Sequence, residues 1–209
     1  MSAQLSRLGG LALLIAGLLM SVSAVLHPND ADPQGIFSPA WAPVHLAFIV
    51  SILFSLLGLP SLYLAQREQA GRLGLVGFCL TLTGAAFFIF PLGFEALVLP
   101  PIAANPANAA MLAPDGPLFG GALGLILITA SIIFSAGALP FGAAMIRAKA
   151  FSPLLGLTFM IGGPLLGFTP PLPQLVGMVG AVVLGIGYCW AGYLLQRQQA
   201  AAVMHTHMV

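Results

Sequence analysis

Six long apolar stretches leave this chain only one solvent in which to fold, the hydrocarbon of a membrane. A membrane-crossing helix needs about 20 mainly apolar residues, because the bilayer core is ~30 Å thick. Six helical spans are predicted, at residues 8–26, 41–65, 73–99, 117–146, 151–168 and 173–195. The period-two alternation typical of a membrane β-barrel is absent, which leaves helices to satisfy the backbone in lipid. The fold class is therefore an all-α, polytopic membrane helix bundle with six transmembrane helices.

The composition excludes the main soluble classes. Only 5 % of the 209 residues are charged and 59 % are hydrophobic, whereas a soluble domain is about a quarter charged. A net charge of +1 gives no basic face for a nucleic acid. The expected partner is the lipid bilayer, together with other membrane subunits or a second copy in a homo-oligomer. Residues 1–209 are predicted to form a single transmembrane domain.

The basic residues predict the orientation. All six lie at the N-terminus, in the 66–72 and 147–150 loops, or near the C-terminus: Arg7, Arg67, Arg72, Arg147, Lys149 and Arg197. Cytoplasmic loops carry an excess of Lys and Arg, so both termini are predicted to be cytoplasmic in a multi-pass protein of the cell (inner or plasma) membrane. The alternative for the first span is a signal peptide cleaved after Ala24.

Small residues repeat at helical spacing and predict helix-packing faces. They lie on the third span (Gly74, Gly77, Gly84), the fourth (Gly120, Gly124) and the sixth (Gly177, Ala181, Gly185), and these three faces are expected to pack against one another. Similar residues at the inner ends of the odd-numbered helices favour three tandem helical hairpins, as in parallel-repeat transporters.

Glu95 is the one charged residue placed within an apolar span, on the same face as Gly84 and the helix-kinking Pro91. A charge there is costly in lipid, so it should face the bundle interior. His27 and His45 are at a similar depth, which makes Glu95 a proton- or cation-coupling candidate and His27, His45 and Glu95 a candidate metal set. Zinc or copper would suit such ligands better than haem, and no cofactor is predicted firmly. On a helical wheel, however, His45 is expected to point away from the inward face of its helix.

No recognised catalytic motif is present, so an enzyme is disfavoured. Three functions stay open. The favoured one is a non-enzymatic membrane subunit or scaffold of a complex. The first alternative is a small-solute or proton carrier that uses Glu95, which predicts Glu95 beside a cavity. The second is a metal-binding membrane protein or metalloenzyme with an outer-face His/Glu site, which predicts three converging side chains.

Overall fold

The computed structural model describes residues 3–30, 32, 34–113, 116–167 and 173–206, and all regular structure in these ranges is helical. Five helices are long and apolar enough to cross a membrane, by length and composition. They are α1 (Ala3–Leu26), α2 (Trp41–Leu64), α3 (Arg67–Leu97), α6 (Ala122–Ala148) and α8 (Gln174–Thr206). The structure thus confirms the predicted helical membrane bundle.

The fifth predicted span is a shorter helix, α7 (Pro153–Gly167), of 15 residues. At ~1.5 Å per residue it is about 22 Å long, less than the ~30 Å of a bilayer core. Its predicted last residue, Phe168, is outside the described residues. Whether α7 crosses the membrane by itself stays a prediction, and its two long neighbours enclose it in the bundle.

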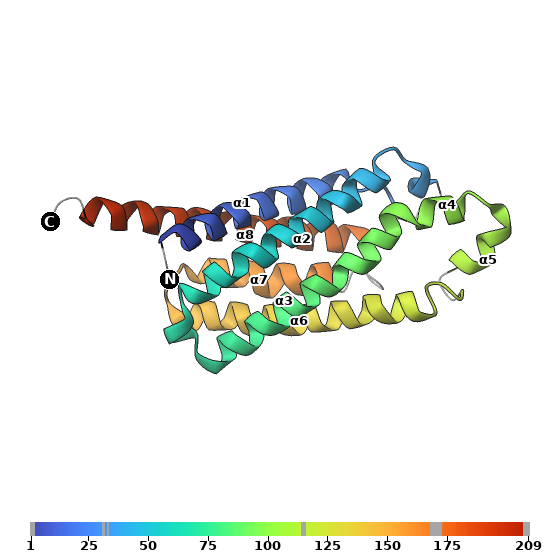
Figure 1. Cartoon of the computed structure of the whole chain (residues 1–209). Helices are drawn as coiled ribbons and strands as arrows, with labels where there is room; N and C mark the ends of the chain where they lie inside the picture. The colour runs from blue at the N-terminus through green and yellow to red at the C-terminus, as the bar shows by residue number, and fades with distance from the viewer. Residues whose placement is uncertain (1–2, 31, 33, 114–115, 168–172, 207–209) are drawn as a thin grey trace.

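The six long elements, which Figure 1 shows from the side, form a closed ring by their contacts. Each packs on the next in chain order, from α1 through α2, α3, α6 and α7 to α8, and α8 returns to pack on α1. The pairs α1–α2, α3–α6 and α7–α8 are the hairpins expected from the sequence, although the repeat relating them stays a prediction. Both chain ends lie at the same end of the bundle.

Short helices cover the opposite end. η1 (Gly35–Phe37) joins α1 to α2, while α4 (Leu99–Ala103), η2 (Pro106–Asn108) and α5 (Ala109–Leu112) lie between α3 and α6. α4 contacts η1 across this end. The α1–α2 and α3–α6 connections, at the end away from the chain termini, are thus long, whereas the α2–α3 and α6–α7 connections, at the end that carries all six basic residues, are short.

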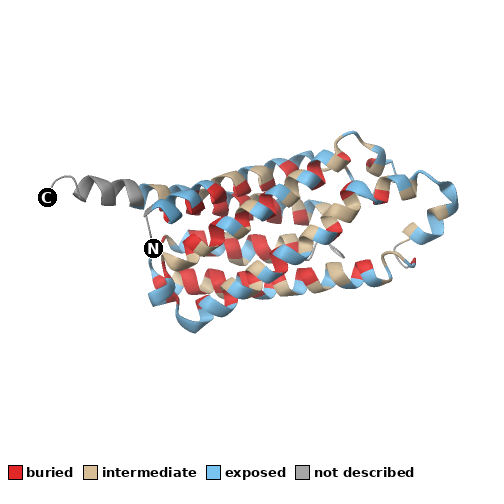
Figure 2. Cartoon of the chain, in the orientation of Figure 1, coloured by how far each residue is buried: buried red, intermediate tan, exposed pale blue. Residues whose placement is uncertain are grey.

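The burial pattern is that of a protein surrounded by lipid (Figure 2). Large aliphatic side chains on the long helices are exposed, among them Leu18, Leu57, Leu125 and Leu175, each by more than half. The core inside the ring contains Leu13, Leu59, Phe141, Phe159 and Leu184. An apolar exterior of this kind would be unstable in water and is suited to hydrocarbon.

Small residues bring the helices close together, but not in the arrangement expected. A Cβ at Gly77 would fall on the backbone of Phe141, and one at Gly84 on that of Phe134, so these glycines hold α3 against α6; at Gly74 it would meet Ala70 and Ala144. Gly185 instead faces Gly17 and Ser21 of α1. The sixth-span face therefore does not meet the third, because α8 packs on α1 and α7.

The fourth-span glycines also differ from the prediction. Gly120 is exposed in the turn before α6, and Gly124 packs against the carbonyl of Phe119 in that turn. The close contact of α6 with α3 is made by Gly137, which faces Thr81. Gly177 and Ala181, on α8, line the space inside the ring.

Candidate functional site

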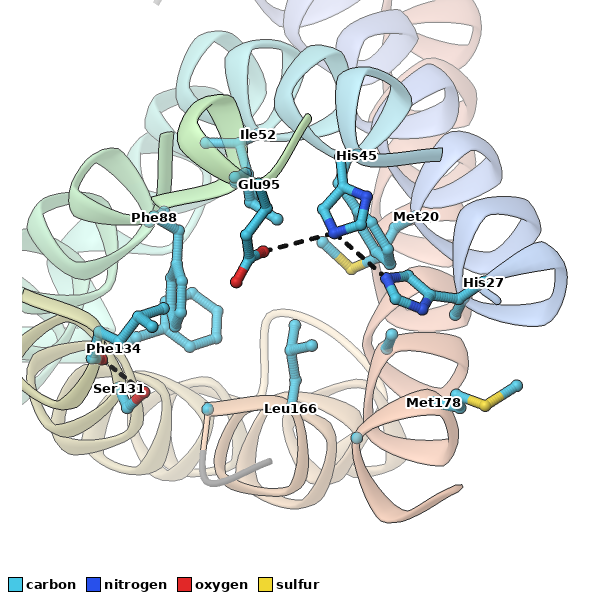
Figure 3. A pocket seen from close by; sticks show the side chains of 18 of the residues that line it. Met20, His27, His45, Ile52, Phe88, Glu95, Ser131, Phe134, Leu166 and Met178 are labelled. Carbon is cyan, nitrogen blue, oxygen red and sulfur yellow. Dashed lines mark hydrogen bonds and ion pairs between the residues drawn. The ribbon is translucent and has the colours of Figure 1, made fainter. Parts of the chain in front are cut away.

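The ring encloses a cavity of about 210 Å³ with walls from all six long elements. Most of its wall is apolar, with Phe48, Ile52, Phe88, Leu127 and Leu166 among the lining side chains. The polar groups are concentrated at one end, where His27, Asp30, His45, Glu95 and Gln174 meet. Figure 3 views this end and places Glu95, His45 and His27 side by side.

His45 is at the centre of this polar end and only 2 % exposed. Its Nδ1 lies 2.7 Å from the carbonyl oxygen of Trp41. A carbonyl only accepts hydrogen bonds, so Nδ1 carries the hydrogen and donates it. Nε2 is left to face Glu95, with 3.3 Å to Oε2, and His27, with 3.4 Å to its Nε2.

The expectation that His45 points away from the bundle interior is wrong. The inward face predicted for α2 consisted of Ala47, Ser51, Ser55 and Gly58. Of these, Ser55 lines the cavity, whereas the Ser51 Oγ donates to the Ala16 carbonyl of α1, at 2.8 Å. His45, Ile52 and Ser55, which are buried, and Phe48, which is half-buried, form the face of α2 that lines the cavity. A helix in a ring packs one face against each of its two neighbouring helices and turns a third face to the centre. A helical wheel shows which residues share a face, but it does not distinguish these three kinds of face.

Glu95 is positioned from both its backbone and its side chain. The Trp41 indole Nε1 donates to the Glu95 carbonyl oxygen at 2.7 Å, which ties the last turn of α3 to the first turn of α2. Its carboxylate projects into the cavity and is 21 % exposed. The contact between Glu95 Oε2 and His45 Nε2 places two acceptors together unless a proton lies between them. The pair therefore holds one proton, on either partner.

His27 continues the chain of polar groups toward the surface. Its Nδ1 lies 2.8 Å from the Pro28 carbonyl, which accepts a hydrogen, and 3.1 Å from Gln174 Nε2, which donates one. Either neutral form of the imidazole therefore finds a partner for Nδ1. Asp30 Oδ1 is 3.5 Å from the same nitrogen, and the Asp30 side chain is 47 % exposed.

Gln174 fixes the geometry of this loop. Its side-chain oxygen accepts from the backbone N–H of Asp30 at 3.0 Å, and its Nε2 donates to the Pro28 carbonyl at 2.7 Å. The first turn of α8 thereby holds the segment that follows α1. Burial raises the pKa of Asp30 above its ordinary value of 3.8; nearby Glu95 acts in the same direction, and the two histidines oppose it.

Two of the three contacts expected of a metal set are present, since His45 touches both His27 and Glu95. The three groups lie in a row in Figure 3, however, and do not surround a common point. Within the described ranges, no group of three His, Cys, Asp or Glu side chains is arranged to hold a metal ion. Gln174 was not among the site residues predicted from the sequence, because a single amide side chain after several prolines forms no recognisable motif.

The far end of the cavity lies deep in the bundle. Ser55 and Tyr188 line it there, and the Ser55 hydroxyl donates to the Ile52 carbonyl oxygen at 2.8 Å. At ~1.5 Å per residue, Ser55 is about 15 Å further along α2 than His45. The cavity therefore extends from the polar end through roughly half the thickness of a bilayer core.

Comparison with protein-family models, with curated proteins and with solved structures finds no match for this chain.

Proposed function

We propose that this protein is a small-solute or proton carrier in which Glu95 is the coupling carboxylate. The observation that carries the proposal is the row Glu95–His45–His27–Asp30, which leads from the wall of a central cavity to a half-exposed carboxylate. A scaffold requires neither a central cavity nor a buried titratable row. The metal alternative has no converging ligand set among the residues that the structure describes.

A proton can be passed along this row in three steps. The Glu95 carboxyl gives its proton to His45 Nε2, His45 Nε2 passes it to His27 Nε2, and His27 releases the hydrogen of its Nδ1 to Asp30 Oδ1. The separations of 3.3, 3.4 and 3.5 Å exceed the usual 2.7–3.2 Å of a hydrogen bond. Each transfer therefore requires the donor and acceptor to approach by a few tenths of an ångström.

The positive-inside rule gives the proposed direction. The end of the bundle with the two termini and all six basic residues is cytoplasmic in this proposal, and both termini lie inside the cell. Asp30 then faces the non-cytoplasmic side. The protein would exchange protons between that side and the central cavity of a multi-pass protein in the cell membrane.

The test is proton flux in liposomes that contain the purified protein and an internal pH-sensitive dye. A pH gradient is imposed, with a potassium ionophore to cancel the membrane potential. Wild-type vesicles should lose the gradient faster than protein-free vesicles, and vesicles with Glu95→Gln should not. Glu68→Gln is the matched control, because Glu68 is in the first turn of α3, at the opposite end of that helix.

Equal rates for the wild type and Glu95→Gln would refute a proton path through Glu95. The scaffold hypothesis would then be favoured, since it assigns no role to this carboxylate. The His45→Phe variant adds a second check, because it removes the only group that bridges Glu95 and His27 within the row.

A further inference from the structure

The central cavity is small for a ligand site. Its volume of about 210 Å³ exceeds the ~150 Å³ apolar cavity that accepts benzene. It is smaller than the ~300–1,000 Å³ pockets that hold drug-sized molecules. A single ring with one compact substituent, or an aliphatic group of similar size, matches this space.

The charged groups around the cavity determine which sign of charge the ligand can carry. Two carboxylates line it, Glu95 and Asp30, and no Lys or Arg is among its described lining residues. His45 and His27 are the other titratable groups facing Glu95; α6 and α7 contribute no ionisable group to the described lining, and α8 contributes only Tyr188. An anion would meet two carboxylates with only imidazoles to compensate, so the electrostatics favour a cation.

The walls are suited to an organic cation in particular. Phe48, Phe88, Phe134 and Tyr188 contribute aromatic rings, and Phe88 packs edge-to-face on Phe134 with centroids 5.9 Å apart. Aromatic faces attract a cation within ~6 Å of the ring, most strongly where water is excluded. A hydrated inorganic ion would instead need several oxygen ligands, and most of this wall offers none.

From the cavity size, its charges and its aromatic walls, we infer that the solute of this site is a small lipophilic organic cation, bound with its charged group at Glu95. The inference rests on the proposed carrier function and names its substrate class. Binding frees the proton held between Glu95 and His45, which leaves through His27 and Asp30. One positive charge enters the site as one leaves, so the exchange is electrically balanced.

The test compares two probes of nearly the same shape. Benzyltrimethylammonium carries a permanent positive charge, and neopentylbenzene is its neutral carbon analogue. Equilibrium dialysis against the purified full chain in mild detergent measures both. We expect the cation to bind the wild type and the Glu68→Gln control alike, and to bind Glu95→Gln at least about tenfold more weakly. The neutral analogue should not distinguish the three proteins.

Two further measurements protect the test against misfolding of one variant. Phe88→Leu keeps the carboxylate but removes an aromatic wall, and it should also weaken cation binding. The wild type should release a proton on binding, measured as a dependence of the binding enthalpy on the ionisation enthalpy of the buffer. A merely apolar cavity would release none.

Equal affinity of the two probes for the wild type, or equal cation affinity of the wild type and Glu95→Gln, would overturn the inference. Proton flux through Glu95 without cation binding would refute the substrate class and leave the carrier standing. Cation binding without proton flux would support the site and refute the carrier.

Discussion

The contact between His45 and Glu95 connects the cavity to the row of titratable groups. The coupling free energy between these two side chains can be measured. We consider three variants, His45→Leu, Glu95→Gln and the two combined. Each single substitution leaves one member of the pair without its partner, while the double variant removes both. The difference between the double variant and the sum of the single ones gives the coupling free energy.

The structure sets the size of this coupling. Two unit charges separated by the 3.3 Å between His45 Nε2 and Glu95 Oε2 attract by ~5 kcal/mol at an effective dielectric constant of about 20. The cost of desolvating both groups offsets part of this Coulomb attraction. The Glu95 side chain is 21 % exposed, so solvent screening weakens the attraction further. What remains is one hydrogen bond to a charged group, so the expected coupling is about 2 kcal/mol.

The assay is reversible unfolding of the four proteins in mixed micelles, followed by the fluorescence of Trp41 and Trp190. The control cycle combines His45→Leu with Glu68→Gln, which should be additive within ~0.5 kcal/mol because the two residues lie at opposite ends of the bundle. A coupling below ~0.5 kcal/mol for His45 and Glu95 would show that no proton is shared between them, and the relay would lose its central step.

Three other predictions concern packing, the cavity and the loop. Gly84→Ala should destabilise the bundle by about 1–3 kcal/mol, since the new methyl meets the Phe134 backbone; in the same unfolding titration Gly93→Ala, with its nearest neighbour at 3.9 Å, should show no such loss. Ala181→Leu should fill part of the cavity, raise stability by up to ~2 kcal/mol and abolish binding of benzyltrimethylammonium; binding at the wild-type affinity would contradict the assigned cavity. Because burial raises the pKa of Asp30, the folded chain binds the proton of this carboxyl group more tightly than the unfolded chain does. Protonation of Asp30 therefore stabilises the folded chain at low pH, and this stabilisation is lost as pH rises above the ordinary pKa of 3.8. In thermal unfolding, the melting temperature of Asp30→Asn minus that of the wild type should therefore increase between acidic and neutral pH, and a decrease of this difference would refute the prediction.

The helices were predictable because each apolar stretch is long and uninterrupted by charge. α2 begins at Trp41 as expected and ends at Leu64, one residue before the predicted limit. α3 begins earlier than predicted, at Arg67, because a short turn precedes Gly71, whose φ of 59° bends the chain there. Glycine adopts this conformation at little cost, and hydropathy does not reveal such a bend.

The candidate site was only partly predictable. The cost of a charge in lipid singled out Glu95 and required an inward position, and the structure places it beside the cavity. The side of α2 on which His45 lies depends on where α1 and α3 pack, and that is a tertiary property. Gln174 joins the site through the ring closure between α8 and α1, a contact between opposite ends of the chain.

The same ring closure has a consequence for the order in which the protein is built. Helices emerge from the ribosome in sequence, so α1 enters the membrane before α8, the helix that closes the ring against it. Until then lipid covers the surface around Gly17 that Gly185 later contacts. The cavity has no complete wall before that moment, and His27 has no Gln174 to orient it. A nascent chain that is stalled or truncated before α8 would therefore be inserted in the membrane with an incomplete cavity, and the polar end of the cavity would form only once α8 packs against α1.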